Sequence, residues 1–258
     1  MRVYHMSGAG NDFAVIDARG LNLELEALAV RLCATTGADG FMAVDDSQIA
    51  DFKLHFYNSN GLRGEMCGNG SRCICKFAYD MGIAGPEMTV ETDAGLVCGW
   101  RLEADRYRVR LNLPSVLDLT RKADCAYVEL GDPGIPHAIT QVADLTWEQA
   151  EQLRPRGRQL RFDPAFPKGA NVSFYRELSA GHVRVLTYER GVEDYTLACG
   201  TGCASIALVL WAQGRLPEGI LKAENRGGDL TVSISSEAGQ LTQVLLEGPA
   251  QLLNTFEI

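Results

Sequence analysis

Apolar residues occur in short runs along this chain, and glycine or proline interrupts most of them. β-Branched, aromatic and alternating patterns predict strands at Phe52–Tyr57, Met88–Thr92, Tyr107–Leu113, His182–Tyr188 and Leu230–Ser235. Apolar residues at helical spacing predict helices over Leu23–Ala34 and Thr146–Leu153. In the second of these, Thr146 is expected to be the N-cap and Gln149 to complete a capping box. Many short strands with few helices predict an α+β fold.

Two further segments share one pattern. Cys67 opens the sequence Cys-Gly-Asn-Gly and precedes the apolar stretch Ile74–Met81, whereas Cys199 opens Cys-Gly-Thr-Gly and precedes Ile206–Gln213. Each apolar stretch ends at a glycine (82 − 67 = 15 and 214 − 199 = 15 residues after the cysteine), as expected of a helix C-terminal cap. The two copies are 199 − 67 = 132 residues apart in a chain of 258, which indicates an internal duplication.

The duplication predicts two halves of related fold. A helix that is apolar on nearly all sides, such as Ile206–Ala212, must be buried all round, so we expect a sheet to wrap each central helix. The chain is expected to cross from one half to the other at Leu113-Pro114-Ser115, where a strand ends at a proline. The first half then ends at residue 113 and the second begins at residue 114.

Composition narrows the class of protein. With 46% hydrophobic and 22% charged residues the chain has enough apolar material for a sizeable core. A formal net charge of −9 argues against a nucleic-acid partner, and the longest apolar run is too short to span a membrane. The N-terminal sequence does not have the pattern of a secretion signal, so we expect a cytoplasmic protein.

The eight cysteines are therefore expected to be thiols in a reducing compartment. Their spacing lacks a Cys-x-x-Cys pair and does not fit a zinc or iron–sulfur site. Cys67 and Cys199 stand out because each is placed at a helix start. The other six are expected to serve packing: Cys33, Cys73, Cys75, Cys98, Cys125 and Cys203.

A cysteine at a helix N-terminus lies beside unpaired N–H groups and a partial positive charge, so its thiol pKa is expected to fall. The glycines that follow would let backbone N–H groups hold a carboxylate. Two such half-sites would place a sulfur on each face of one substrate α-carbon, so that one thiolate removes a proton and the other thiol delivers one. This scheme inverts the carbon and needs no metal or organic cofactor.

One Cys-Gly-x-Gly copy alone would more often be an ordinary turn before a helix, but two copies in the same register favour the functional interpretation. Further motifs accompany them over nearly the whole chain: Ser7–Phe13, Gly37–Gly40, Asn58, Pro136-His137, Gly169–Phe174, Glu189–Gly191 and Ala198–Gly202. Together these residues resemble the diaminopimelate epimerase family.

The resemblance implies two pseudo-symmetric α+β domains, each a mostly antiparallel sheet wrapped around a central helix. The C-terminal strand would return to the first domain, giving domains of residues 1–113 with 249–258 and of residues 114–248. It also implies a homodimer, independent of pyridoxal phosphate and metals, that interconverts L,L- and meso-2,6-diaminopimelate for lysine and peptidoglycan synthesis.

The resemblance also assigns roles to residues. Cys67 and Cys199 would be the acid/base pair, and Asn11 would contact the substrate near the reacting centre. The cradle for the reacting carboxylate would comprise Gly68, Asn69, Gly200 and Thr201. Ligands for the remaining polar groups, including the distal end, would be Asn58, Asn171, Glu189 and Arg190. Glu189 would also tune the thiol of Cys199, and His137 that of Cys67, although a purely structural histidine is an equal alternative.

Two departures from the family pattern keep alternatives open. Ile135 stands where family members commonly have an asparagine before the Pro-His pair, and Val192–Thr196 is one residue longer than the commonest spacing. Both features favour, as an alternative, a related cofactor-independent racemase or epimerase of another amino acid. An amino-acid-binding protein without chemistry, and a redox sensor that uses Cys67 and Cys199, are further alternatives.

Overall fold

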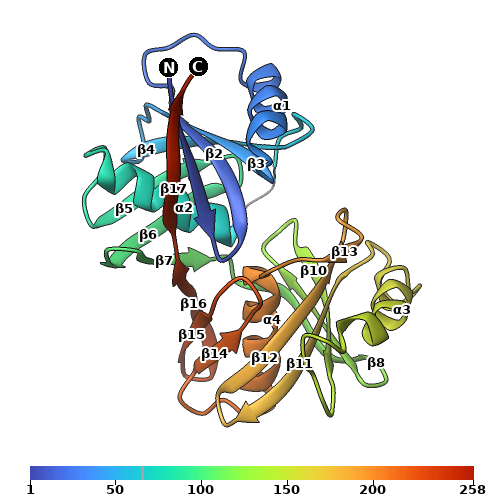
Figure 1. Ribbon diagram of the computed structural model, residues 1–258. Helices are drawn as coiled ribbons and strands as arrows, with labels where there is room; N and C mark the ends of the chain where they lie inside the picture. Colours follow the sequence, from blue (N-terminus) through green and yellow to red (C-terminus); the bar gives the residue numbers. More distant parts are fainter. Residues whose placement is uncertain (65–66) are drawn as a thin grey trace. The chain divides into compact units, whose positions relative to one another are not determined.

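The computed structural model describes residues 1–64 and 67–258. The chain forms two compact units, unit 1 of Met1–Arg110 with Glu247–Ile258 and unit 2 of Leu111–Leu246 (Figure 1). The described residues contain four α-helices and seventeen strands, so the expected α+β class is confirmed. The eight cysteines are thiols and not disulfides.

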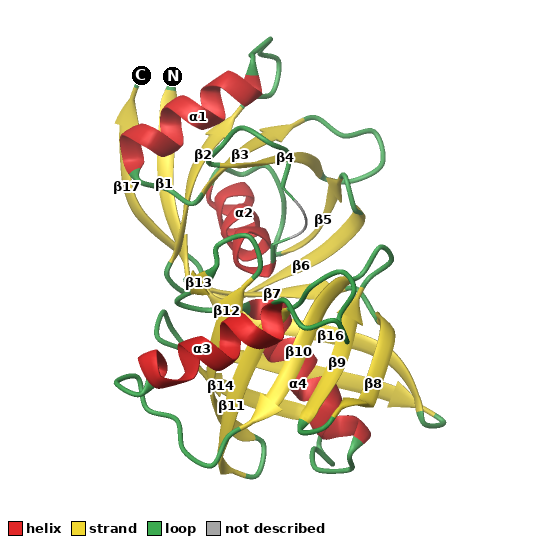
Figure 2. Ribbon diagram, turned by 90° about the vertical axis from the view of Figure 1, so that its right-hand side faces the viewer, coloured by secondary structure: helices red, strands yellow, loops and turns green. Residues whose placement is uncertain are grey.

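Unit 1 surrounds one helix with strands. Its helices are α1 (Leu25–Thr36) and α2 (Gly68–Asp80), and Figure 2 shows α2 enclosed by the strands while α1 lies outside them. The strands are β1 (Arg2–Gly8), β2 (Asn11–Asp17), β3 (Gly40–Asp45), β4 (Phe52–Asn58), β5 (Glu87–Thr92), β6 (Gly95–Glu103), β7 (Arg106–Leu111) and β17 (Gln251–Glu257). Strand β1 pairs antiparallel with β2 and β17, so the C-terminal strand belongs to this unit.

Unit 2 is built in the same way around α4 (Gly200–Ala212), with α3 (Ala150–Arg161) as its second helix. Its strands are β8 (Pro114–Lys122), β9 (Cys125–Leu130), β10 (Ile135–Gln141), β11 (Asn171–Ser179), β12 (His182–Glu189), β13 (Asp194–Tyr195), β14 (Ile220–Glu224), β15 (Leu230–Glu237) and β16 (Gln240–Pro249). Strand β16 runs on into unit 1 at its last residues.

The order of strand pairing repeats between the units. In unit 1, β2 and β3 are parallel across α1, β3 and β4 are antiparallel, and β4 and β5 are parallel across α2. In unit 2, β10 and β11 are parallel across α3, β11 and β12 are antiparallel, and β12 and β14 are parallel across α4. A repeat of both pairing and helix placement confirms the internal duplication.

The two central helices end in the same way. Gly82 and Gly214 have left-handed backbones with φ of 66° and 71°. Each glycine N–H bonds the carbonyl three residues earlier, and the next N–H bonds the carbonyl five residues earlier. This is the Schellman arrangement, which requires a residue with positive φ at the glycine position. The expected glycine caps are therefore confirmed.

The helix expected at Thr146–Leu153 differs from α3 at both ends. Half of the expected capping box forms, because the Gln149 side chain accepts the Thr146 N–H at 3.0 Å. This hydrogen bond closes a turn that precedes the helix, and the helix itself begins only at Ala150. The helix then continues past Pro155 to Arg161. Gly157 lets it lie close to β12, since a Cβ there would be 3.2 Å from Tyr188 Cβ. Pro155 lacks an N–H, so the helix continues without one of its backbone hydrogen bonds.

Candidate functional site

Cys67 and Cys199 occupy equivalent positions in the two units. Each is the N-cap of its central helix, with φ and ψ of −118° and 115° at Cys67 and −119° and 105° at Cys199. Their carbonyls accept the first helical hydrogen bonds, at 2.8 Å from Ser71 N and 3.0 Å from Cys203 N. The prediction that both cysteines lie at helix N-termini is therefore confirmed.

In unit 1 the helix start faces the Cys67 thiol. The Gly70 N–H donates to Cys67 Sγ at 3.5 Å, and Cys67 is partly exposed. A sulfur that receives a backbone N–H at the positive end of a helix is better able to carry negative charge. Gly8 on β1 permits this approach of α2, because a Cβ there would be only 2.7 Å from the Asn69 carbonyl oxygen.

Asn11 reaches the same helix start. It follows the tight turn of Ala9 and Gly10, whose φ values are 54° and 86°, and this turn sets β2 against β1. Asn69 Nδ2 donates to Asn11 Oδ1 at 2.7 Å, and Asn11 Nδ2 donates to Asp39 Oδ2 at 3.2 Å. The structure thus brings Asn11 together with the Cys67–Asn69 segment.

Asn58 lies two strands away from Asn11. It is the last residue of β4, opposite Gly40 on β3, which in turn pairs with Phe13 on β2. Its side chain is exposed, and Nδ2 donates to the Arg63 carbonyl at 3.5 Å. Asn58 therefore lies at the same end of these strands as Asn11, and no hydrogen bond joins the two side chains among the described contacts.

In unit 2 a hydroxyl joins the thiol to a histidine. Cys199 Sγ is 3.6 Å from Thr201 Oγ1, and that oxygen is 3.0 Å from His137 Nε2. Gly202 makes room for this helix start, since a Cβ there would be 2.6 Å from Ser173 Oγ. Thr201, which the resemblance places in the carboxylate cradle, connects Cys199 to His137.

The pKa of Cys199 differs from the expectation. Burial raises it well above the ordinary thiol value, and the negative charge of Glu189 raises it further. The Thr201 hydroxyl and the Gly202 N–H lower the same pKa but do not compensate. The expected decrease is thus wrong for Cys199, because loss of solvent outweighs the helix N-terminus. At neutral pH this residue is a protonated thiol and can serve as an acid.

His137 is a neutral imidazole. It is fully buried, and burial followed by the positive charge of Arg190 lowers its pKa to about 3. It begins the parallel pairing of β10 with β11, opposite Asn171. Its Nε2 contacts Thr201 beside Cys199, so an effect on Cys67 stays a prediction.

The other polar residues of unit 2 gather around Arg190. Asn171 Oδ1 accepts the Arg190 N–H at 2.8 Å, and the Arg190 guanidinium donates to the Lys168 carbonyl at 3.3 Å. Glu189 Oε1 accepts the Thr196 hydroxyl at 2.7 Å. The segment after Arg190 forms the short strand β13, which pairs with Tyr188 and Glu189. The extra residue of this segment is therefore accommodated in a hairpin.

Ile135 is the first residue of β10, two positions before His137, and pairs with Leu130. It is partly buried and brings a hydrocarbon side chain to the strand that carries His137. Ile135 is the counterpart of Asn11 in the duplicated strand pairing. His137 opposes the first residue of β11, just as Phe13 opposes the first residue of β3, and Ile135 and Asn11 each lie two residues earlier on their strand.

Sequence reasoning missed two charged residues at the Cys67 helix. Arg72 is fully buried and donates to Asn69 Oδ1 at 2.9 Å and to the Gly68 carbonyl at 3.1 Å. Asp39 accepts from Asn11. The available signal was the presence of an arginine in a helix that must be buried on all sides, because such a charge requires partners.

Five of the six remaining cysteines are buried, as expected for packing, whereas Cys98 on β6 is partly exposed. Over residues 1–64 and 67–258, no group of three or more His, Cys, Asp or Glu side chains is arranged to hold a metal ion. None of the described helices is long and apolar enough to cross a membrane.

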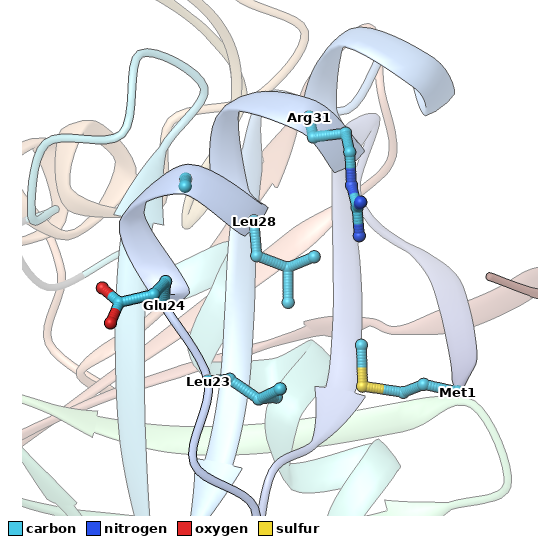
Figure 3. Close-up of a pocket in the computed structure, with 6 residues that line it drawn as sticks. Met1, Leu23, Glu24, Leu28 and Arg31 are labelled. Atoms are coloured by element: carbon cyan, nitrogen blue, oxygen red, sulfur yellow. The ribbon is translucent and has the colours of Figure 1, made fainter.

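Unit 1 also has a surface hollow of about 320 Å³ beside α1 (Figure 3). Its lining residues are Met1, Leu23, Glu24, Ala27, Leu28 and Arg31. Since none of these is a predicted site residue, the hollow is separate from the Cys67 half-site.

Comparison with known proteins covers nearly the whole chain. A family model described as diaminopimelate epimerase matches residues 3–112 and 131–253. Diaminopimelate epimerase of Aquifex aeolicus is 37% identical over 96% of this chain and 94% of its own length. That of Chlorobaculum tepidum is 34% identical over 95% of this chain and 96% of its own.

Solved structures share the fold at low sequence identity. A phenazine biosynthesis protein of the PhzF family from Bacillus anthracis has a TM-score of 0.78 at 17% identity, over 100% of this chain and 98% of its own. A hydroxyproline epimerase from Agrobacterium vitis has a TM-score of 0.72 at 19% identity, over 99% of this chain and 91% of its own. The family match and the curated relatives, together with the duplicated cysteine helices, show that the chain belongs to the diaminopimelate epimerase family.

Proposed function

We propose that this protein is an isomerase that interconverts L,L- and meso-2,6-diaminopimelate without a cofactor. The observation that carries the proposal is the duplicated helix N-terminus with a cysteine at its cap, in a chain 37% identical to a named diaminopimelate epimerase. Lysine and peptidoglycan synthesis would be the processes that use the product.

The proposed reaction transfers protons through the two thiols. The thiolate of one cysteine takes the α-proton, and the electron pair of the C–H bond moves to the α-carbon and its carboxylate. The thiol of the other cysteine then gives its proton to the opposite face, so one thiol and one thiolate remain. Because burial and Glu189 raise the Cys199 pKa, Cys199 starts as the thiol and Cys67 as the base.

Helix N-termini would stabilise the intermediate. The N–H groups of Gly68, Asn69, Gly200 and Thr201 would hold the α-carboxylate as negative charge develops on it, which is the principle of an oxyanion hole. Arg190 would bind the distal carboxylate through two parallel hydrogen bonds, with Asn58, Asn171 and Glu189 on the amino groups. The Asn171 bond to the Arg190 N–H supports this, because it fixes the backbone that carries the guanidinium.

A substrate panel tests the function. The purified enzyme is incubated with L,L-diaminopimelate, proline, 4-hydroxyproline and glutamate, and the products are separated by chiral chromatography. We expect meso-diaminopimelate to form and the other amino acids to keep their configuration. Conversion of another amino acid, with none of diaminopimelate, would favour the alternative racemase that Ile135 motivates.

We further propose a cytoplasmic homodimer. The eight free thiols of the described residues support a reducing compartment, where such thiols persist. Leu252 and Leu253 on the terminal strand β17 are 46% and 48% exposed, which supports a surface for self-association. Light scattering after size-exclusion chromatography is expected to give twice the mass of one chain, and a mass of 28.1 kDa would contradict the dimer.

A further inference from the structure

Four side chains of unit 1 form a continuous line of hydrogen bonds. Arg72 Nη2 donates to Asn69 Oδ1 at 2.9 Å, Asn69 Nδ2 donates to Asn11 Oδ1 at 2.7 Å, and Asn11 Nδ2 donates to Asp39 Oδ2 at 3.2 Å. The line runs from a fully buried guanidinium to an exposed carboxylate. Two proposed substrate ligands, Asn11 and Asn69, occupy its middle.

The two end groups of this line determine which side chain donates and which accepts in each of its hydrogen bonds. A guanidinium can only donate hydrogen bonds, and an ionised carboxylate can only accept them. An asparagine amide can do either, depending on which of its two ends faces the neighbour. With Arg72 at one end and Asp39 at the other, each amide has one orientation in which every bond is made. Rotation of either amide by 180° would place two donors or two acceptors against each other.

Both ends are also tied to the backbone. Arg72 donates to the Gly68 carbonyl at 3.1 Å and to the Pro249 carbonyl at 3.3 Å. Asp39 Oδ2 accepts the Asp12 N–H at 3.0 Å. The line therefore links the helix start, the β2 start and the chain that enters β17. A buried charge is costly unless it is bonded in this way, and apolar residues of similar volume often stabilise a fold equally well.

We propose that Arg72 and Asp39 are positioning residues that hold Asn11 and Asn69 in a single amide orientation for the substrate. This inference rests on the proposed function. In the observed orientation the second N–H of Asn11 can donate to a carboxylate, and the second lone pair of its Oδ1 can accept from an ammonium group. A reversed amide would present oxygen to the carboxylate and repel it.

Substitution of the two ends tests the proposal. Asp39→Asn keeps the shape but removes the charge, so the oxygen that accepts the Asp12 N–H and Asn11 Nδ2 becomes a neutral amide oxygen and holds Asn11 less firmly. Arg72→Met removes the donor, and Arg72→Lys retains a donor in the same place. We expect kcat/KM for L,L-diaminopimelate to fall at least tenfold in Asp39→Asn and Arg72→Met, mainly through KM, and Arg72→Lys to recover part of the loss.

Two matched controls lie in the same unit. Asp93→Asn removes a charge from the exposed Asp93–Arg63 ion pair, and Arg101→Met removes a guanidinium that packs over the Tyr79 ring. Both should keep the wild-type KM. If Arg72→Met does not fold, Asp39→Asn still decides, since its side chain is exposed.

The outcomes separate the two proposals. Wild-type protein that neither epimerises diaminopimelate nor exchanges its α-proton would refute the proposed function. Active wild-type protein with unchanged KM and kcat in Asp39→Asn and Arg72→Met would refute the positioning role alone. A lowered melting temperature with unchanged KM would assign the line to stability and would also overturn the inference.

Discussion

The two cysteines share a backbone geometry but differ in their surroundings. Cys199 is 7% exposed and lies near Glu189, so its thiol pKa is high, whereas Cys67 is partly exposed. A two-thiol mechanism needs one protonated and one ionised sulfur at the start of each turnover. Because the two equivalent cysteines are buried to different extents, a duplicated fold can provide one protonated and one ionised sulfur.

Thr201 allows the environment of Cys199 to be tested. Its hydroxyl lowers the thiol pKa, so Thr201→Val is expected to raise that pKa further and to slow the direction in which Cys199 acts as base about tenfold. The rise of the rate with pH should move to higher pH in a pH–rate profile. Thr201→Ser, which retains the hydroxyl, should behave like the wild type. An unchanged profile in Thr201→Val would show that the hydroxyl does not tune this thiol.

At the residue scale, the sequence predicted where the two cysteines lie better than it predicted the environment of their side chains. Cys67 and Cys199 were identifiable from the glycines that follow them. The high pKa of Cys199 was not: the resemblance pointed to Glu189 as a residue that tunes this thiol, but burial contributes most to the shift and depends on strands that pack only after folding. Arg72 and Asp39 were missed for the same reason, since their roles depend on bonds to Asn69 and Asn11.

At the element scale, helix ends with strong local signals were predictable. Both central helices begin directly after their cysteine, and the predicted glycine caps each of them two residues after its last helical residue. The helix α3 was predicted poorly: the Thr146–Gln149 contact closes a turn before the helix, and the helix continues past Pro155 to Arg161.

The approach of β1 to α2 gives a test at this scale. Gly8→Ala would place a Cβ 2.7 Å from the Asn69 carbonyl, so the helix start must move. We expect the free energy of unfolding to fall by about 1–3 kcal/mol and activity to fall with it. Chemical denaturation measures the first effect. Gly85→Ala is the matched control, because its Cβ would have 3.8 Å to the nearest oxygen and should be tolerated. Equal stability of the two variants would contradict the close packing.

For the whole molecule, the duplication explains why a single chain carries two central helices that are each capped by a cysteine. It was evident from the spacing of the two cysteine motifs, and the repeated strand pairing confirms it. The order of strand pairing, in which the two strands that flank each helix are parallel, could not be predicted from the apolar segments of the sequence. Strand partners depend on contacts between distant segments, which the local pattern does not specify.

The buried thiols predict a loss of stability in alkali. Burial raises the pKa of both Cys73 and Cys75 to about 12, above the value of about 8.5 in an unfolded chain. Between these values the unfolded state loses the proton first, so unfolding becomes easier as pH rises. Each thiol should lower the free energy of unfolding by about 1.4 kcal/mol per pH unit in this range.

Denaturation curves from pH 7 to pH 11 measure this effect. Cys75→Ala should be less stable than the wild type at pH 7, because it leaves a cavity, but should lose less stability per pH unit above about pH 9. Parallel curves for the two proteins would contradict a protonated, buried Cys75.

The central claim is that Cys67 and Cys199 exchange protons on opposite faces of one substrate carbon. It is tested most directly by reaction of L,L-diaminopimelate in heavy water, with mass spectrometry of the separated stereoisomers for the wild type, Cys67→Ala and Cys199→Ala. We predict that the wild type forms meso-diaminopimelate with one deuterium at the inverted carbon, and that neither variant inverts it. Inversion by either variant, or a meso product that retains the original hydrogen, would contradict the account.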